Sequence, residues 1–236
     1  MKPLIIAHRG GSAYESENTL KAFRKAIKLK VDFIEFDARL TKDKKLIVFH
    51  DKKVDRLTDG KGYVKNLYFR DIRKLRVNGE KIPTSEEAVK LIGNKVGIII
   101  ELKDKGCEKK IVNLIKENNL KNVIIISFNK SIIRTIKKLD NNLRTGLIFS
   151  MYPFNHHRIR RVLYDPVKST FRVGADEIFY YYRYVTRKLI KMAHDNGLRV
   201  NIWTVDNIKT MKKFIEMGVD GIATNRPGLL KKLISK

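Results

Sequence analysis

A small set of side chains in this sequence can bind a cation, hold a phosphate group or move a proton, and each stands at the end of a short apolar run. The set comprises His8, Arg9, Glu35, Asp37, His50, Glu101 and Lys103. Imidazoles titrate near neutral pH and can act as general acid and general base. Carboxylates bind hard divalent cations, while guanidinium and ammonium groups bind phosphate oxygens. Together these groups are typical of a site that hydrolyses a phosphate ester with the help of a metal ion.

Three members of the set are carboxylates that the expected strands bring together. Glu35 and Asp37 stand two residues apart, so on a strand they project to one face. Glu101 belongs to a neighbouring expected strand and joins them. Three like charges cannot stay ionised side by side without a cation between them. Because the ligands are all oxygens and none is a cysteine, the cluster favours Mg²⁺ or Ca²⁺, or else Mn²⁺, over zinc.

Short apolar runs alternate along the chain with segments of helical periodicity. The runs are Leu4–Ala7, Phe33–Asp37, Gly97–Glu101, Val123–Ser127, Thr145–Phe149, Glu177–Tyr180, Val200–Thr204 and Gly221–Thr224. Strands that alternate with helices form a parallel sheet through right-handed crossovers. An open doubly wound sheet would bring a glycine-rich phosphate loop, and the sequence has none. The pattern therefore predicts an α/β fold, a (β/α)8 TIM barrel with its active site at the C-terminal ends of the strands.

One interval in this pattern is longer than the others and predicts an insertion after the second strand. The residues after Asp37 are expected to turn at Lys42–Lys45 and return antiparallel, which would bring His50 beside Asp37. The residues from about 51 to 83 are expected to form a small inserted subdomain on the catalytic face. We expect a single TIM-barrel domain that spans 1–236.

Residue types at the expected helix ends support these helices. Asn18 and Asn207 are expected N-caps, and Thr84 with Glu87 forms an expected capping box. Gly218 stands where a glycine in the left-handed conformation often ends a helix.

The charge balance is strongly positive and spread along the whole chain. There are 51 Lys and Arg residues against 25 Asp and Glu residues, a formal net charge of +26. Such a field favours anionic partners, which include a small phosphate-bearing substrate, an anionic membrane surface and nucleic acid. The one cysteine, Cys107, excludes a disulfide within the chain and suits a reducing compartment. Because neither a signal peptide nor a membrane span is evident, the expected location is the cytoplasm.

The chain resembles the glycerophosphodiester phosphodiesterase family, a group of PI-phosphodiesterase-like TIM barrels, and the matching motifs run from end to end. They are His8-Arg9-Gly10, Glu17-Asn18-Thr19, Glu35-Phe36-Asp37, His50-Asp51, Ile82-Pro83-Thr84, Glu101-Leu102-Lys103, Trp203-Thr204-Val205, Asp220-Gly221-Ile222 and Asn225-Arg226-Pro227. His-Arg-Gly alone would be a weak signal, but the whole ordered series is specific.

The resemblance implies metal-dependent hydrolysis of glycerophosphodiesters, such as glycerophosphocholine and glycerophosphoethanolamine, to sn-glycerol 3-phosphate and an alcohol. By position, Glu35, Asp37 and Glu101 would bind the metal, and His8 and His50 would form the acid–base pair. Arg9 and Lys103 would hold the phosphate, and Trp203 would pack against the glycerol. Glu17 and Asn18 would have supporting roles.

Two alternative functions and one basic segment stay open on the sequence alone. A lysophospholipase D-like enzyme would use the same catalytic core, and a barrel that binds nucleic acid or an anionic membrane would use only the charge. The residues after the fifth strand include His156, His157, Arg158, Arg160 and Arg161, which would form either a lid or head-group subsite or a solvated segment. The aromatic run Phe179–Tyr182 is expected on the loop after the sixth strand.

Overall fold

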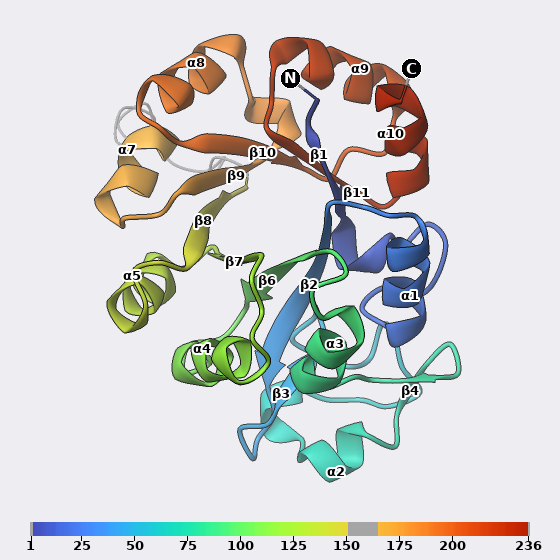
Figure 1. The fold of residues 1–236 in the computed structure, drawn as a ribbon. Helices are drawn as coiled ribbons and strands as arrows, with labels where there is room; N and C mark the ends of the chain where they lie inside the picture. Colours follow the sequence, from blue (N-terminus) through green and yellow to red (C-terminus); the bar gives the residue numbers. More distant parts are fainter. Residues whose placement is uncertain (1, 151–164, 236) are drawn as a thin grey trace, which may run out of the picture.

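A computed structural model of the chain describes residues 2–150 and 165–235, and these form a closed barrel of parallel strands surrounded by helices (Figure 1). The barrel closes because β1 (Leu4–Ala7) pairs in parallel with both β2 (Phe33–Leu40) and β11 (Gly221–Thr224). The remaining barrel strands are β6 (Gly97–Leu102), β7 (Val123–Ser127), β8 (Arg144–Phe149), β9 (Glu177–Tyr181) and β10 (Arg199–Trp203). The predicted TIM barrel is confirmed, with strand boundaries that shift by a few residues at most.

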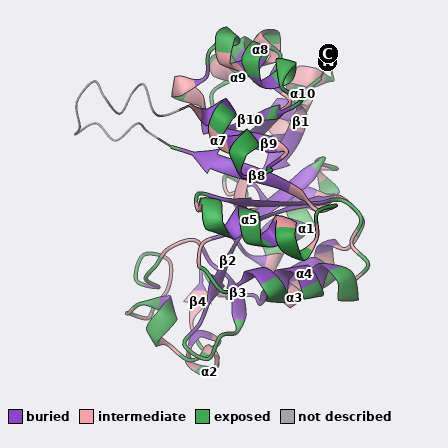
Figure 2. Ribbon diagram, turned by 90° about the vertical axis from the view of Figure 1, so that its left-hand side faces the viewer, coloured by how far each residue is buried: buried purple, intermediate pink, exposed green. Residues whose placement is uncertain are grey.

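Helices cover the outside of the barrel and separate consecutive strands. They are α1 (Leu20–Lys28), α3 (Ser85–Ile92), α4 (Glu108–Glu117), α5 (Lys130–Leu139), α7 (Pro166–Arg172), α8 (Arg187–Asp195), α9 (Ile208–Met217) and α10 (Pro227–Ile234). Their apolar faces pack on the strands and their polar faces are exposed (Figure 2). Within the described ranges, no helix is long and apolar enough to cross a bilayer.

The helix caps agree with the sequence in all but one case. Asn207 caps α9, the Thr84–Glu87 capping box begins α3, and Gly218 ends α9 with φ of 81°. The prediction that Asn18 caps α1 was wrong, because Thr19 accepts the hydrogen bond from Ala22. Asn18 instead has φ of 59° and directs its side chain to Asp37.

The segment between β2 and α3 begins with the expected hairpin. Strand β3 (Leu46–Val48) pairs antiparallel with the end of β2, and the Phe49 amide donates to the Asp37 carbonyl at 3.0 Å. Four short elements follow: a 3₁₀ turn at Val64–Asn66, α2 (Phe69–Ile72), β4 (Arg76–Val77) and β5 (Glu80–Lys81). They share a small apolar cluster of their own around Phe49, Val54 and Ile72. That the whole chain forms one domain with this insertion stays a prediction.

The barrel interior holds an apolar layer beneath the strand ends that carry the polar residues. Ile99, Ile126, Ile148 and Phe179 are buried in this layer. Phe179 therefore belongs to strand β9 and the barrel core, so the expectation that it lies on a loop at the rim was wrong. Period-2 alternation explains the difference: Tyr180, the next residue, points outward into the layer between strands and helices.

Candidate active site

The first polar residues of the site stand on a tight turn directly after β1. His8–Gly10 form a short 3₁₀ turn in which Arg9 has φ of 50° and Gly10 has φ of 86°. A Cβ atom on Gly10 would lie 2.8 Å from both Ala22 Cβ and Phe23 Cδ1. Glycine is thus required here both by the backbone conformation and by the close packing of α1. The turn holds His8 and Arg9 at the mouth of the barrel.

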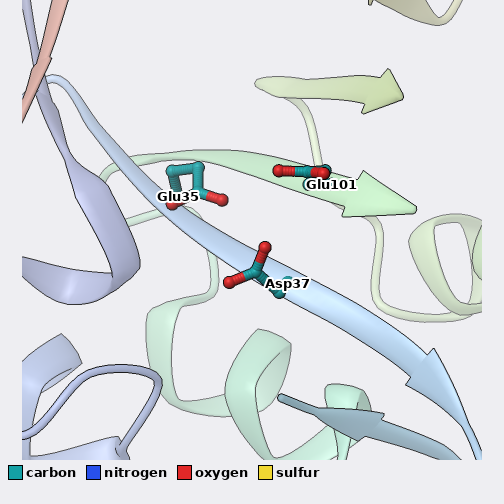
Figure 3. Close-up of side chains that lie close together, drawn as sticks. All are labelled: Glu35, Asp37 and Glu101. Carbon is teal, nitrogen blue, oxygen red and sulfur yellow. The ribbon is translucent and has the colours of Figure 1, made fainter. Parts of the chain in front are cut away.

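Three buried carboxylates from two adjacent strands meet beside this turn (Figure 3). Glu35 and Asp37 lie on β2 and Glu101 lies on β6, where it pairs in register with Asp37. One oxygen from each carboxylate falls in a group whose members lie within 4.8 Å of one another. Alternation along β2 places Glu35 and Asp37 on the same face, as predicted.

Two cations, one backbone amide and one side-chain amide contact these carboxylates. The Lys103 ammonium lies 2.9 Å from Asp37 Oδ1 and also pairs with Glu101. The Arg9 guanidinium lies 3.4 Å from Asp37 Oδ2, and the Arg9 backbone amide donates to Glu35 at 2.8 Å. Asn18 Nδ2 donates to Asp37 Oδ2 at 2.7 Å. Asp37 is therefore the best compensated of the three carboxylates.

The pKa values of the carboxylates follow this unequal compensation. Burial opposes ionisation of all three, but Lys103 and Arg9 overcome it at Asp37 and hold the pKa of that carboxyl well below its usual range. Burial and the neighbouring Asp37 raise the pKa of Glu35 well above its ordinary value. Burial raises the pKa of Glu101 to about 7, against the lowering effect of Lys103. Two of the three carboxylates thus lack enough positive charge to stay ionised.

This deficit and the donor set fit a hard divalent cation. Carboxylate oxygens are the ligands that Mg²⁺ and Ca²⁺ prefer, and a cation there would compensate Glu35 and Glu101. Among the described residues, this is the group of titratable side chains whose ligand atoms lie close enough to hold a metal ion.

His8 is oriented from behind by an amide side chain. Its Nδ1 lies 2.8 Å from Asn225 Oδ1, and Asn225 Nδ2 donates to Asp206 Oδ2 at 2.8 Å. Asp206 thus fixes the amide with its oxygen toward the imidazole, so His8 Nδ1 carries the proton and Nε2 is the free nitrogen. Burial and the Arg9 charge lower the pKa of His8 to about 4. At neutral pH His8 is therefore an uncharged imidazole.

His50 is oriented by a carboxylate and by the fixed backbone around it. Its Nδ1 lies 2.6 Å from Asp51 Oδ1. The buried Arg39 donates to the His50 carbonyl at 2.8 Å and pairs with Asp104 at 2.9 Å. Burial, with the charges of Lys103 and Arg9, lowers the pKa of His50 below its ordinary value, against the raising effects of Asp37 and of the hydrogen bond to Asp51. A carboxylate partner favours the imidazolium form more than the amide partner of His8 does.

One cavity of about 100 Å³ connects these groups. Its polar wall is made by His8, Arg9, Glu35, His50, Glu101 and Lys103. Its apolar wall is made by Ile6, Ile126, Phe128, Ile148, Phe179, Trp203 and Ala223. Asp37, only 1% exposed, lies behind the polar wall. The structure thus brings the sequence-predicted site residues to one place, and Trp203 lines the same cavity.

Several partners of the site residues had no role assigned from sequence. Asn225 stands at the C-terminal end of β11, a position that is itself a signal for the site in a parallel barrel. Asp206 and Arg39 gave no such signal, because each acts through a contact that only the fold creates. The basic segment with His156, His157, Arg158, Arg160 and Arg161 lies outside the described residues, within 151–164.

Comparisons with known proteins match nearly the whole chain. Residues 8–229 match the family model described as the glycerophosphoryl diester phosphodiesterase family. A glycerophosphodiester phosphodiesterase of Caldanaerobacter subterraneus subsp. tengcongensis is 38% identical over 251 residues, which cover 100% of this chain and 99% of the relative.

Solved structures share the fold over nearly the whole chain. The crystal structure of a Silicibacter pomeroyi protein superposes with a TM-score of 0.90 at 22% identity, over 99% of this chain and 93% of the other. A phosphodiesterase from Oleispira antarctica, in complex with its product sn-glycerol-3-phosphate, superposes with a TM-score of 0.86 at 23% identity, over 99% and 97%.

Proposed function

This chain belongs to the glycerophosphoryl diester phosphodiesterase family and is an enzyme of that type, and we propose that its substrates include glycerophosphocholine and glycerophosphoethanolamine. The products would be sn-glycerol 3-phosphate and the free alcohol, and this glycerol phosphate is the product bound by the Oleispira antarctica phosphodiesterase. The observation that carries the proposal is the carboxylate cluster with two imidazoles beside it at the same cavity. A divalent cation, Mg²⁺ or Ca²⁺ and otherwise Mn²⁺, would be held by Glu35, Asp37 and Glu101.

In this proposal the cations of the chain bind the phosphate and the histidines move the protons. Arg9 and Lys103 face the cavity and would hold the phosphate oxygens. The bound divalent cation would act as a Lewis acid toward the phosphate. Trp203 would pack against the glycerol backbone, since it lines the same cavity as Arg9, Glu35 and Lys103.

We assign the base to His8 and the acid to His50. His8 is uncharged at neutral pH and presents Nε2, so it would take the proton of the nucleophile. His50 Nδ1 is bonded to Asp51, so its Nε2–H would donate to the leaving oxygen, with the imidazolium stabilised by that carboxylate. The assignment holds whether the nucleophile is water or the adjacent glycerol hydroxyl. Phosphorus NMR of the time course separates the two, because only the hydroxyl route gives a cyclic phosphate.

The deciding experiment measures release of glycerol 3-phosphate from both diesters with Mg²⁺, Ca²⁺, Mn²⁺ or EDTA. Wild type should turn over only with a cation, and His50→Ala and Glu101→Ala should each lose the metal-dependent rate. Lysophosphatidylcholine is the comparison substrate: a rate on it above that on glycerophosphocholine would move the assignment to a lysophospholipase D. Turnover that persists in EDTA would contradict the cation site.

A further inference from the structure

Arg56, on the inserted segment, contacts two carboxylates with one guanidinium. Its Nε lies 2.6 Å from Asp51 Oδ2 and its Nη2 lies 3.2 Å from Asp51 Oδ1. The same Nη2 lies 2.9 Å from Glu17 Oε1, and Nη1 lies 3.4 Å from Glu17 Oε2. The planar fork therefore fixes the orientation of both carboxylates at once, which the single ammonium of a lysine cannot do.

Each of these carboxylates holds a group of the site on its other side. Asp51 contacts His50 Nδ1 at 2.6 Å, and Glu17 contacts the Arg9 guanidinium at 2.8 Å. A continuous series of charged hydrogen bonds thus runs from His50 through Arg56 to Arg9. Arg9 comes from the loop after β1 and His50 from the hairpin after β2. Arg56 therefore links these two loops through Glu17 and Asp51.

The electrostatics of both carboxylates depend on Arg56. Its hydrogen bonds are the largest influence that lowers the pKa of Asp51 to about 2. Burial opposes ionisation of Glu17, but Arg56 and Arg9 hold the pKa of its carboxyl below the ordinary value. Asp51 and Glu17 therefore stay ionised and directed toward His50 and Arg9.

We propose that Arg56 is a positioning residue of the active site, which holds Asp51 against His50 and Glu17 against Arg9. The inserted segment is then a part of the catalytic unit rather than an appendage to the barrel. This inference rests on the proposed function, because it takes His50 as the proton donor and Arg9 as the phosphate ligand.

The same segment supplies a matched control. Arg73 donates to Glu87 at 2.8 Å and to the Ile82 carbonyl at 2.8 Å, so it also makes a guanidinium–carboxylate pair. Its partner Glu87 belongs to the capping box of α3 and contacts no residue of the cavity wall in the described structure. Loss of Arg73 would affect the local fold but not the orientation of His50.

The test compares Arg56→Ala, Arg56→Lys and Arg73→Ala in the full chain on glycerophosphocholine with its activating cation. Arg56→Ala should lower kcat/KM about 10- to 100-fold, as loss of an outer positioning partner does in other sites. Arg56→Lys should recover little of this loss, and free guanidinium ion should partly restore Arg56→Ala. Arg73→Ala should stay within about twofold of wild type at a temperature where it is folded.

A second readout does not need substrate. In wild type the His50 Nδ1–H proton should give a downfield, slowly exchanging NMR signal, assigned by its loss in His50→Gln, and Arg56→Ala should broaden or abolish it. If wild type fails on every diester but the signal still depends on Arg56, the proposed function fails and the positioning role stands. An unchanged signal, full activity of Arg56→Lys, or an equal loss in Arg73→Ala would each overturn the proposal.

Discussion

The Nδ1 atom of His8 lies 2.8 Å from Oδ1 of Asn225, although 217 positions separate the two residues. The contact joins the first and last strands of the barrel where β1 and β11 pair. Ser12 donates to the same oxygen at 2.7 Å, and Asp206 accepts from both the side chain and the backbone amide of Asn225. Closure of the barrel therefore sets the tautomer of the proposed base.

Replacement of Asn225 should reduce turnover without loss of substrate binding. In Asn225→Leu the imidazole loses its hydrogen bond, and kcat should fall about 10- to 100-fold with KM changed less. In Asn225→Asp a carboxylate faces Nδ1 and raises the pKa of His8, so the acidic limb of the kcat/KM profile should move up by about 1 pH unit or more. Steady-state kinetics across pH measure both effects.

Asn207→Ala is the control for these variants. Asn207 caps α9 through Lys209 and Thr210 and has no contact with His8. Its loss should cost about 1 kcal/mol of stability and leave the pH profile in place. Wild-type kinetics in Asn225→Leu would show that His8 is not the base.

Stabilisation by the divalent cation should increase with pH. Because burial raises the pKa of Glu101 to about 7, the folded protein keeps a proton there that the unfolded chain releases near its ordinary pKa. Without cation, this group therefore makes the unfolding free energy fall as pH rises through that window, up to about pH 7. A bound cation requires the ionised Glu101 carboxylate, so in its presence this fall of the unfolding free energy with rising pH disappears. The rise in Tm on addition of Ca²⁺ or Mg²⁺ should thus be larger at about pH 8 than at about pH 6.

Thermal unfolding with cation and with EDTA, each at both pH values, measures this effect. Subtraction of the Tm in EDTA from the Tm with cation removes the contribution of groups whose pKa the cation does not change. His8 lines the same cavity, and its lowered pKa acts in the opposite direction below about pH 6.5. Glu101→Gln should reduce the pH dependence, while Glu86→Gln, an exposed residue paired with Lys90, should not. A cation effect on Tm that is equal at both pH values would contradict the assignment of Glu101 as a ligand.

The order of strands and the residues at their ends were predictable because they depend on local patterns. Alternation along β2 sets the common face of Glu35 and Asp37, and the apolar run before Glu101 marks a fully buried strand. The turn residues after Thr41 and the apolar return explain why the hairpin to His50 was predictable as well.

The sequence did not predict contacts between residues far apart in the chain, or side-chain orientations that depend on tertiary packing. Asn18 has a side chain suited to an N-cap, but it is buried beside Asp37 and bonds to that carboxylate instead. The partner of His8 comes from the other end of the chain, and no local pattern pairs His8 with Asn225. Phe179 resembled a rim aromatic in a tyrosine-rich run, but its register on β9 directs it into the barrel.

Turnover of a net anionic diester should depend more on salt than turnover of a zwitterionic one. The net charge of +26 attracts glycerophosphoglycerol, which carries one negative charge, but exerts little net force on glycerophosphocholine. From low ionic strength to about 0.5 M salt, kcat/KM for the anionic diester should fall about tenfold, because the salt screens the field. Equal salt dependence of the two substrates would show that the surface charge does not steer substrate to the site.

At the end of the barrel opposite the active site, substitution of a buried charged residue should lower stability and leave activity unchanged. Glu177, 1% exposed, accepts from Arg144 Nε at 3.1 Å and from Asn201 Nδ2 at 2.7 Å at the start of β9. Arg144 Nη2 also donates to Glu177, so Arg144→Met leaves this carboxylate buried with two donors fewer, and the unfolding free energy should fall by about 3 kcal/mol. Urea unfolding measures the loss, and kcat/KM of the folded variant should equal that of wild type.

Removal of the carboxylate as well tests the physical reason. In Arg144→Met with Glu177→Gln no charge is left buried, and the amide still meets Asn201, so the double variant should be more stable than Arg144→Met alone. If instead the two losses add, the cost of Arg144→Met comes from lost packing of its side chain on Phe33, which it covers at 5.8 Å, and not from an uncompensated charge.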